Sequence, residues 1–306
     1  MITPKLKIKY PNLQILEYSK KIKMFFHKTK RKTTYRQVLI GTICIIAVFV
    51  YLAFNGYFGV LNNNNSSEIS ENQSDESYKL EDILPAFKAN DESIVRHIHY
   101  TLKYNEAHEQ AEWIAYSLEA DKINGNASRK NDKFYADPMV KTKSAEWYDY
   151  KNSGYTRGHL VAAADLKYSE EAQAETFLMS NISPQIARFN DGIWRILEEK
   201  ARYWAKKEKQ VWVITGPVLQ NGLKKIGQKT QISVPEKFYK IIADLTEPEI
   251  KIIAFIMPQE FTDKSIRSYV VSVDEIEKLT GIDFFPKLAD ELENRLESGI
   301  SFAGWD

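Results

Sequence analysis

Alternating and continuous runs of hydrophobic residues predict several β-strands in the C-terminal three quarters of the chain. Residues 97–104 alternate between apolar and polar positions, as a half-buried strand does. Apolar runs bounded by turn-forming or polar residues predict further strands at 211–215, 237–244 and 251–257. Residues 107–119 fit either an amphipathic helix or a helix followed by a strand at 113–118.

Other segments carry the three- and four-residue spacing of helices. The clearest is 191–207, where large apolar residues recur on one face. Residues 170–179 are helical in composition, with Ser169 as a plausible N-cap, and residues 272–280 predict a short helix. Because these elements do not follow a βαβ rhythm, they predict an α+β domain whose largely antiparallel sheet is flanked by helices.

The longest apolar run lies near the N-terminus, from Val38 to Leu61, and no charged residue occurs between Arg36 and Glu68. A helix of about 20 apolar residues spans a bilayer core, so this run predicts a transmembrane helix. A cleavable signal peptide is the alternative. It fits less well, because its apolar region is usually about 7–15 residues and no small-residue cleavage site follows cleanly here. We therefore expect residues 38–61 to be a signal anchor in a lipid bilayer.

Charge divides the chain at this anchor. Residues 1–37 carry 11 basic residues and one acidic residue, whereas residues 62–306 carry 31 basic and 40 acidic ones. By the positive-inside rule, residues 1–37 form a cytoplasmic tail and the remainder is exported to the periplasmic or extracellular side. Residues 62–77 are polar and acidic and predict a flexible linker, which leaves residues 78–306 as the folded domain.

The cysteine content restricts the chemistry of that domain. The single Cys44 lies in the predicted anchor, so the domain contains neither a disulfide nor a cysteine-bound zinc ion. No dense carboxylate cluster is evident in the sequence either, which favours a weakly held, hard divalent cation.

Three residues suit metal-assisted cleavage of a phosphodiester. His159 follows Arg157-Gly158, and an imidazole with a pKa of about 6.5 can deprotonate water at neutral pH. Asn190 offers a neutral oxygen to a hard cation, and Glu198, two helical turns later, can hold the water shell of that cation. Taken alone, each residue has a simpler interpretation. His159 would be a structural histidine at a strand end, Asn190 a helix N-cap and Glu198 a solvated helix glutamate. Their combination favours a catalytic site.

The motifs around these residues resemble the DNA/RNA non-specific endonuclease family, the ββα-metal nucleases. Thr156-Arg157-Gly158-His159 is similar to the family's Asp-Arg-Gly-His, and the block that follows fits without gaps at Asn181, Pro184, Gln185, Asn190 and Glu198. Further similarities extend the resemblance over roughly residues 95–295, at Arg129, Phe134, Asp137-Pro138, 215–218 and 234–240.

The resemblance implies a ββα-metal nuclease domain and a role for each matched residue. His159 is the general base, Asn190 binds Mg²⁺ directly, with Mn²⁺ as a possible substitute, and Glu198 binds that ion through water. The remaining site residues are Asn181, which supports the site, Arg129, which stabilises charge on the phosphate, and Arg157 of the four-residue motif. Thr156 departs from the family's aspartate. A threonine can replace an aspartate that braces a loop, whereas activity falls if the aspartate tunes His159 or positions Arg157.

The expected function is that of a magnesium-dependent, sequence-non-specific endonuclease with DNA and RNA as substrates, and with a homodimer as a possible assembly. Residues 78–306 carry 31 basic and 36 acidic residues, which weakens the expected attraction to a polyanion. Two alternatives remain open: a membrane-tethered phosphodiesterase that acts on small nucleotides or oligonucleotides, and a catalytically weakened binding module.

Overall fold

The computed structural model describes residues 78–128 and 133–306. The expected cytoplasmic tail at 1–37, anchor at 38–61 and linker at 62–77 lie outside the described residues, as does Arg129. The described residues all belong to one compact unit, Ser74–Asp306. Within the two described ranges, none of the helices has the length and apolar character needed to cross a membrane.

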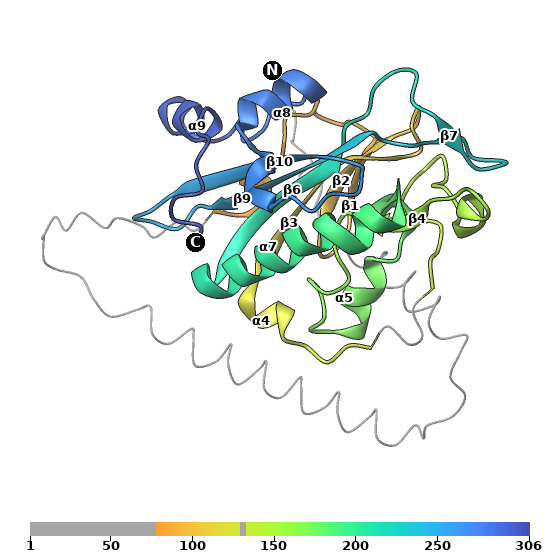
Figure 1. Ribbon diagram of the computed structural model, residues 1–306, viewed down its shortest axis with the longest axis horizontal. Coiled ribbons are helices and arrows are strands. Elements are labelled where there is room, and N and C mark those ends of the chain that lie inside the picture. Colours follow the sequence, from red (N-terminus) through yellow and green to blue (C-terminus); the bar gives the residue numbers. More distant parts are fainter. Residues whose placement is uncertain (1–77, 129–132) are drawn as a thin grey trace, which may run out of the picture. The chain divides into compact units, whose positions relative to one another are not determined.

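A seven-stranded sheet forms the centre of this unit (Figure 1). Its strand order is β1-β2-β3-β6-β9-β10-β11, and every neighbouring pair is antiparallel. The strands are β1 (Ile94–Arg96), β2 (Thr101–Asn105), β3 (Gln110–Glu119), β6 (Gln210–Pro217), β9 (Lys237–Asp244), β10 (Lys251–Pro258) and β11 (Val270–Val271). The prediction of an α+β domain with an antiparallel sheet is confirmed.

Helices cover both faces of the sheet (Figure 1). One face carries α4 (Ala120–Ile123), α5 (Glu170–Glu175) and α7 (Arg195–Glu208), and the other carries α3 (Leu80–Ile83), α8 (Val273–Thr280) and α9 (Asp290–Glu297). Strand β9 shows why the strands read as continuous apolar runs. Because successive side chains point to opposite faces, Phe238 packs under α7 and Tyr239 packs on the other side.

A smaller antiparallel pair, β4 (Thr156–His159) and β5 (Ile182–Gln185), lies beside the sheet and leads into the long helix. After β5 come the short α6 (Ala187–Phe189), a π-helical turn at Asn190–Trp194 and then α7. The predicted helix at 191–207 therefore begins later than expected. Gly192, with φ −100° and ψ −116°, breaks the helical geometry just before α7. The order β4, β5, α7 forms the ββα unit that the resemblance implied.

Two predicted elements were wrong in detail. Residues 97–104 do not form one strand. Residues 97–100 form a turn, in which the backbone N–H of His97 donates to the Tyr100 carbonyl, and 101–104 belong to β2, which pairs with β1 as a hairpin. Residues 110–119 form the long strand β3, so the strand considered at 113–118 is present and begins earlier, while the helix expected before it is replaced by a turn and the first residues of the strand. This strand is buried on both faces, so its sequence lacks the alternation that identifies a half-buried strand.

The remaining predictions hold closely. Strand β9 has the expected bounds, and β6 and β10 extend the expected strands by a few residues. The hydroxyl of Ser169 accepts from the backbone N–H of Ala172, and that of Ser272 accepts from Glu275, so both serines cap their helices. Helix α5 ends at Glu175, four residues before the expected Met179. Two short strands, β7 (Lys225–Ile226) and β8 (Ile232–Ser233), and 3-10 turns at Trp147–Tyr150, Met179–Asn181 and Ile266–Tyr269 complete the described elements.

Candidate metal and catalytic site

The β4–β5 pair holds the four-residue motif in close contact with the following block. Thr156 lies opposite Gln185 and His159 lies opposite Ile182. Gly158 allows this contact, because a Cβ atom at that position would lie 2.1 Å from the side-chain Oε1 of Gln185. Any larger residue at position 158 would displace Gln185.

His159 ends β4 and is partly exposed. Its ring packs against two aromatic rings that also contact each other, with centroids 5.6 Å from Phe134 and 5.0 Å from Phe177. The indole Nε1 of Trp194 donates a long hydrogen bond of 3.4 Å to the His159 carbonyl oxygen. The start of the long helix is thus joined to the end of β4, and the imidazole orientation is restricted by aromatic contacts.

Asn190 connects the helical part of the unit to the same strand. Its side-chain Nδ2 donates to Thr156 Oγ1 at 3.1 Å, and that hydroxyl donates in turn to the Gln185 carbonyl at 2.8 Å. Asn190 has helical dihedral angles between α6 and the π-helical turn and does not act as a helix N-cap. Because Nδ2 faces Thr156, the amide oxygen Oδ1 is the atom that can serve as a metal ligand.

Asn181 is fully buried and satisfies backbone groups on two segments. Its Oδ1 accepts from Val161 N at 2.8 Å, while its Nδ2 donates to the carbonyls of Val161 at 3.0 Å and Thr176 at 2.8 Å. The Asn181 backbone carbonyl also accepts from Leu160 N. Asn181 therefore fixes the backbone that follows His159.

Arg157 contacts the same aromatic residue as His159. Its guanidinium carbon lies 4.7 Å from the centroid of the Phe134 ring, and its buried Nε makes no hydrogen bond. Phe134 therefore contacts both Arg157 and His159. Arg129, the residue expected to stabilise charge on the phosphate, lies outside the described residues.

Glu198 lies on α7 within a group of charged residues that the sequence analysis missed. Burial raises the pKa of its carboxyl, and Asp165 adds to this, while the cations Lys240 and Arg202 oppose it. Arg202 forms an ion pair of 2.7 Å with Asp165, and Asp165 also accepts from the Tyr116 hydroxyl at 2.7 Å. A nearby divalent cation would favour the charged form of Glu198, so the site suits a metal whose water shell that carboxylate holds.

Lys240 is the least expected member of this group. It occupies β9 among apolar neighbours and is 1% exposed, with its Nζ 4.8 Å from the Trp194 ring centroid. Burial lowers its pKa, and Glu198 and Asp165 oppose that effect. A lysine inside the run Phe238–Ile242 is the sequence signal that could have revealed it, because a charge inside a buried strand needs a partner.

The donor set fits a hard divalent cation. Asn190 offers an amide oxygen and Glu198 a carboxylate, which are the ligand types that Mg²⁺ takes beside its waters. The expectation that the domain lacks a dense carboxylate cluster was wrong, because Asp274, Glu277 and Glu297 lie together on the opposite face of the sheet. That cluster is remote from the ββα unit, since helices α8 and α9 carry it.

Comparisons with known proteins agree with this geometry. The sequence pattern of the DNA/RNA non-specific endonuclease family matches residues 83–291. The chain belongs to this family. The match nearly coincides with the range of roughly 95–295 indicated by the motifs, and nucleases of this family are metal-dependent.

Individual relatives come from mitochondria and from a cyanobacterium. "Nuclease EXOG, mitochondrial" of Mus musculus is 34% identical over 209 residues, which are 63% of this chain and 57% of the mouse protein. "Nuclease" of Nostoc sp. is 33% identical over 216 residues, covering 66% of this chain and 76% of that protein. "Endonuclease G, mitochondrial" of Homo sapiens is 29% identical over 202 residues, covering 62% and 68%. The chain spans less than two thirds of the length of the EXOG relatives.

A solved structure shares the fold. A chain of the crystal structure of the EndoG/EndoGI complex matches with a TM-score of 0.63 and 26% identity, covering 69% of this chain and 91% of that chain. The ββα-metal nuclease fold expected from the motifs is therefore confirmed for the described domain.

Proposed function

We propose that this protein is a magnesium-dependent, sequence-non-specific endonuclease that hydrolyses phosphodiester bonds of DNA and RNA. The observation that carries the proposal is the ββα unit itself. Hydrogen bonds from Asn190 to Thr156 and from Trp194 to the His159 carbonyl join the candidate metal ligand and the candidate base through neighbouring elements. Membership of a nuclease family supports the same reaction.

His159 acts in this proposal as the general base. A water molecule in line with the departing oxygen must lose its proton as it attacks phosphorus, and an imidazole accepts that proton at neutral pH. Packing against Phe134 and Phe177 restricts the orientation of the ring. Asn190 and Glu198 would hold Mg²⁺, directly and through water, and the ion would neutralise charge developing on the phosphate and leaving oxygen.

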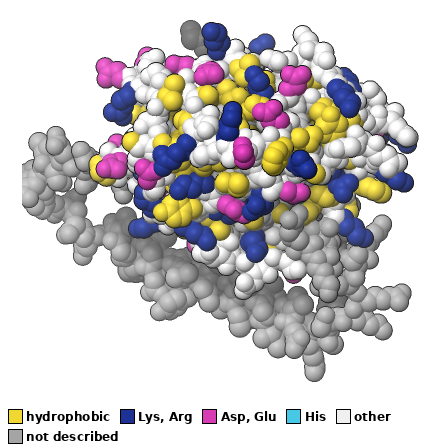
Figure 2. Space-filling model, viewed as in Figure 1, with side chains coloured by type: hydrophobic (Ala, Val, Ile, Leu, Met, Phe, Trp, Pro, Cys, Tyr) yellow, Lys and Arg dark blue, Asp and Glu magenta, His cyan; other side chains and the backbone are white. Residues whose placement is uncertain are grey.

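Substrate binding must overcome an unfavourable net charge. Lys, Arg, Asp and Glu side chains are interspersed over the face shown in Figure 2 and do not form a continuous basic band. Two lysines near the ββα unit instead lie over aromatic rings. Lys224 Nζ is 5.2 Å from the Tyr155 ring centroid, and Lys229 Nζ is 5.9 Å from that of Tyr148. Such pairs can bind a nucleic acid by stacking a base and contacting a phosphate.

A cleft lies beside the pair formed by Lys224 and Tyr155. Its volume is about 320 Å³, and it is lined by Tyr155, Ile186, Lys224, Val234, Pro235, Glu236 and Gln259. Tyr155 directly precedes β4 and Ile186 directly follows β5, so the cleft borders the catalytic strands. We infer that a nucleotide flanking the cleaved bond occupies it. Lys224→Ala should then raise KM for a polynucleotide several-fold and leave kcat nearly unchanged.

Cleavage assays test the function directly. The purified protein is incubated with plasmid DNA, with RNA and with a small phosphodiester, each with magnesium or with chelator. The proposal expects cleavage of both polymers only with magnesium, and conversion of supercoiled plasmid into nicked and linear forms before small products accumulate. Cleavage that continues in excess chelator would contradict the metal requirement.

A small-substrate phosphodiesterase is the second candidate, and the net negative charge of residues 78–306 favours it. Faster turnover of the small diester than of either polymer in the same assay would select it. If folded protein turns over none of the three substrates, the result would instead favour a catalytically weakened binding module.

Membrane attachment is part of the proposal and rests on the sequence outside the described residues. The basic segment 1–37, the uncharged run 38–61 and the acidic linker 62–77 support a cytoplasmic N-terminus and an exported catalytic domain. Protease added to intact spheroplasts should remove the catalytic domain and leave the N-terminal tail protected. A catalytic domain that resists protease until the membrane is broken would reverse the proposed orientation.

A further inference from the structure

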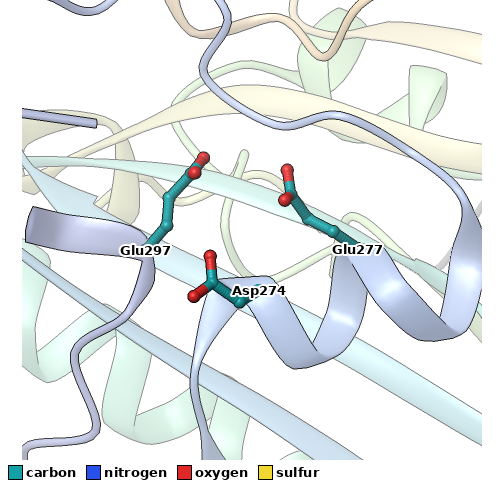
Figure 3. A group of neighbouring side chains, drawn as sticks. All are labelled: Asp274, Glu277 and Glu297. Atoms are coloured by element: carbon teal, nitrogen blue, oxygen red, sulfur yellow. The ribbon is translucent and has the colours of Figure 1, made fainter. Parts of the chain in front are cut away.

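Three carboxylates meet where α8 and α9 come together, on the face of the sheet opposite α7. Asp274 and Glu277 lie one turn apart on α8, and Glu297 is the last residue of α9. One oxygen from each lies within 4.8 Å of the others. Figure 3 shows the three side chains directed toward a common space between the helices.

Glu297 provides an independent indication that this space receives a ligand. The residue is 7% exposed, and its buried Oε1 accepts no hydrogen bond. A buried charged oxygen without a donor is costly, and the C-terminal end of a helix adds an unfavourable dipole for an anion. The geometry of Glu297 therefore calls for either a cation or a proton at this position.

Within the described parts of the chain, none of the ion pairs involves Asp274, Glu277 or Glu297. Glu277 Oε1 accepts the backbone N–H of Phe284 at 2.7 Å, which fixes that side chain in place. Burial, with Glu277 as the largest of four surrounding carboxylates, raises the pKa of Glu297 to about 8. The local electrostatics are thus uncompensated by protein cations.

We propose that Asp274, Glu277 and Glu297 bind a divalent cation of the calcium class, which links α8 to α9. All three donors are carboxylate oxygens, the ligand type that hard cations prefer. Ca²⁺ binds oxygens at about 2.3–2.6 Å, so ligands on opposite sides of the ion lie roughly 5 Å apart. Oxygens that lie within 4.8 Å of one another can share one such ion, and three carboxylates suit Ca²⁺ better than Mg²⁺, which usually takes one or two and keeps several waters.

This cation is structural and separate from the candidate catalytic ion. Helices α8 and α9 pack on the hydrophobic cluster that contains Tyr239 and Phe284, whereas α7 packs on the other face. Binding should stabilise the C-terminal helices without contacting substrate. The inference does not depend on the proposed nuclease activity, and the experiment can succeed or fail independently of it.

The test measures Ca²⁺ binding by the full chain in detergent, carrying Asn190→Ala to remove the ligand proposed at the other site. Isothermal titration should show a Ca²⁺ site that disappears when Glu297→Gln is added. At a hundredfold excess over the dissociation constant, Ca²⁺ should raise the melting temperature by roughly 5–10 °C. Glu275→Gln is the matched control, because Glu275 is an exposed residue of α8 outside the cluster, and it should keep the Ca²⁺ response.

Glu297→Gln also distinguishes a cation from a proton. In chelator, the neutral glutamine should melt above the parent, because it removes the cost of burying or protonating the Glu297 carboxyl, and Ca²⁺ should no longer shift its melting temperature. A parent protein that binds no Ca²⁺ and is stabilised only by acidification would overturn the proposal in favour of a protonated Glu297. A Ca²⁺ response that survives Glu297→Gln would place the ion elsewhere and overturn it equally.

Discussion

The side-chain amide of Asn190 donates a hydrogen bond of 3.1 Å to the hydroxyl of Thr156, 34 residues earlier in the chain. The same hydroxyl donates to the Gln185 carbonyl at 2.8 Å, so it fixes Asn190 relative to both strands of the ββα unit. Thr156 occupies the position at which the family motif has aspartate. Its observed contacts are those of a brace for the candidate metal ligand.

Removing the Thr156 hydroxyl should therefore weaken metal binding. Thr156→Val keeps the shape of the side chain but loses both hydrogen bonds, and the magnesium concentration at half-maximal cleavage should rise about 10–100-fold. Thr156→Ser keeps the hydroxyl and serves as the control, with a near-native magnesium requirement. Equal magnesium requirements for the valine and serine variants would show that the hydroxyl does not position Asn190.

Thr156→Asp separates the two roles considered for this position. An aspartate can accept from Asn190 but cannot donate to the Gln185 carbonyl, so a bracing role predicts activity close to or slightly below native. A several-fold increase in kcat, measured at saturating magnesium, would indicate instead that an acidic residue at this position tunes His159.

Asn190→Ala removes the proposed direct ligand. Cleavage at low magnesium should fall steeply, because an alanine supplies no oxygen and the ion would depend on Glu198 through water alone. The variant should melt like the parent, since Asn190 is partly exposed and does not cap a helix. Native rates for this variant across a magnesium titration would exclude Asn190 from the site.

Local motifs predicted much of the site but not the contacts that assemble it. His159, Asn181 and Asn190 could be identified because their spacing follows family motifs. The bond between Asn190 and Thr156 depends on how two strands and a helix pack, which spacing does not specify. Lys240 was missed for a similar reason. Its interaction with Glu198 exists only because β9 packs under α7, and the local sequence does not specify that packing.

In the fold, too, local patterns were predicted and long-range contacts were not. The helix α8 and the strand β9 were predicted almost at their observed bounds. Strand β3 was predicted only in one of two alternatives and only over 113–118, because a strand buried on both faces has no period-two pattern. The hairpin at His97 was also missed. That histidine is tied to Asp137, 40 residues away, by a contact that a local pattern does not record.

The buried ion pair between His97 and Asp137 should give stability a distinct pH dependence. The two side chains are fully buried and lie 2.8 Å apart. Burial disfavours the charged form of both side chains. The charge and hydrogen bond of Asp137 outweigh burial at His97 and raise its pKa above 6.5, and those of His97 likewise lower the pKa of Asp137 below 3.8. Glu175 adds to the effect on His97, and Ser180 adds to that on Asp137.

The sign follows from these directions. The His97 contribution is complete below pH 6.5 and is lost as pH rises through its raised pKa, while that of Asp137 is complete above pH 3.8 and is lost as pH falls. Urea unfolding of Asp137→Asn at pH 6 should show a loss of about 3–5 kcal/mol in the free energy of unfolding. Lys141→Met, which breaks the exposed pair with Glu92, should change it little. Comparable losses in both variants would contradict a special contribution from the buried pair.

The most direct test of the nuclease assignment is the pH–rate profile of plasmid cleavage by the parent and by His159→Ala at saturating magnesium. Loss of a general base costs about 10²–10⁴-fold in kcat, and the variant should lose the limb that rises through an imidazole pKa in the parent. DNA affinity should change little, and an unchanged melting temperature must show that the variant is folded. A folded His159→Ala protein that cleaves DNA and RNA at the parental rate would contradict the account.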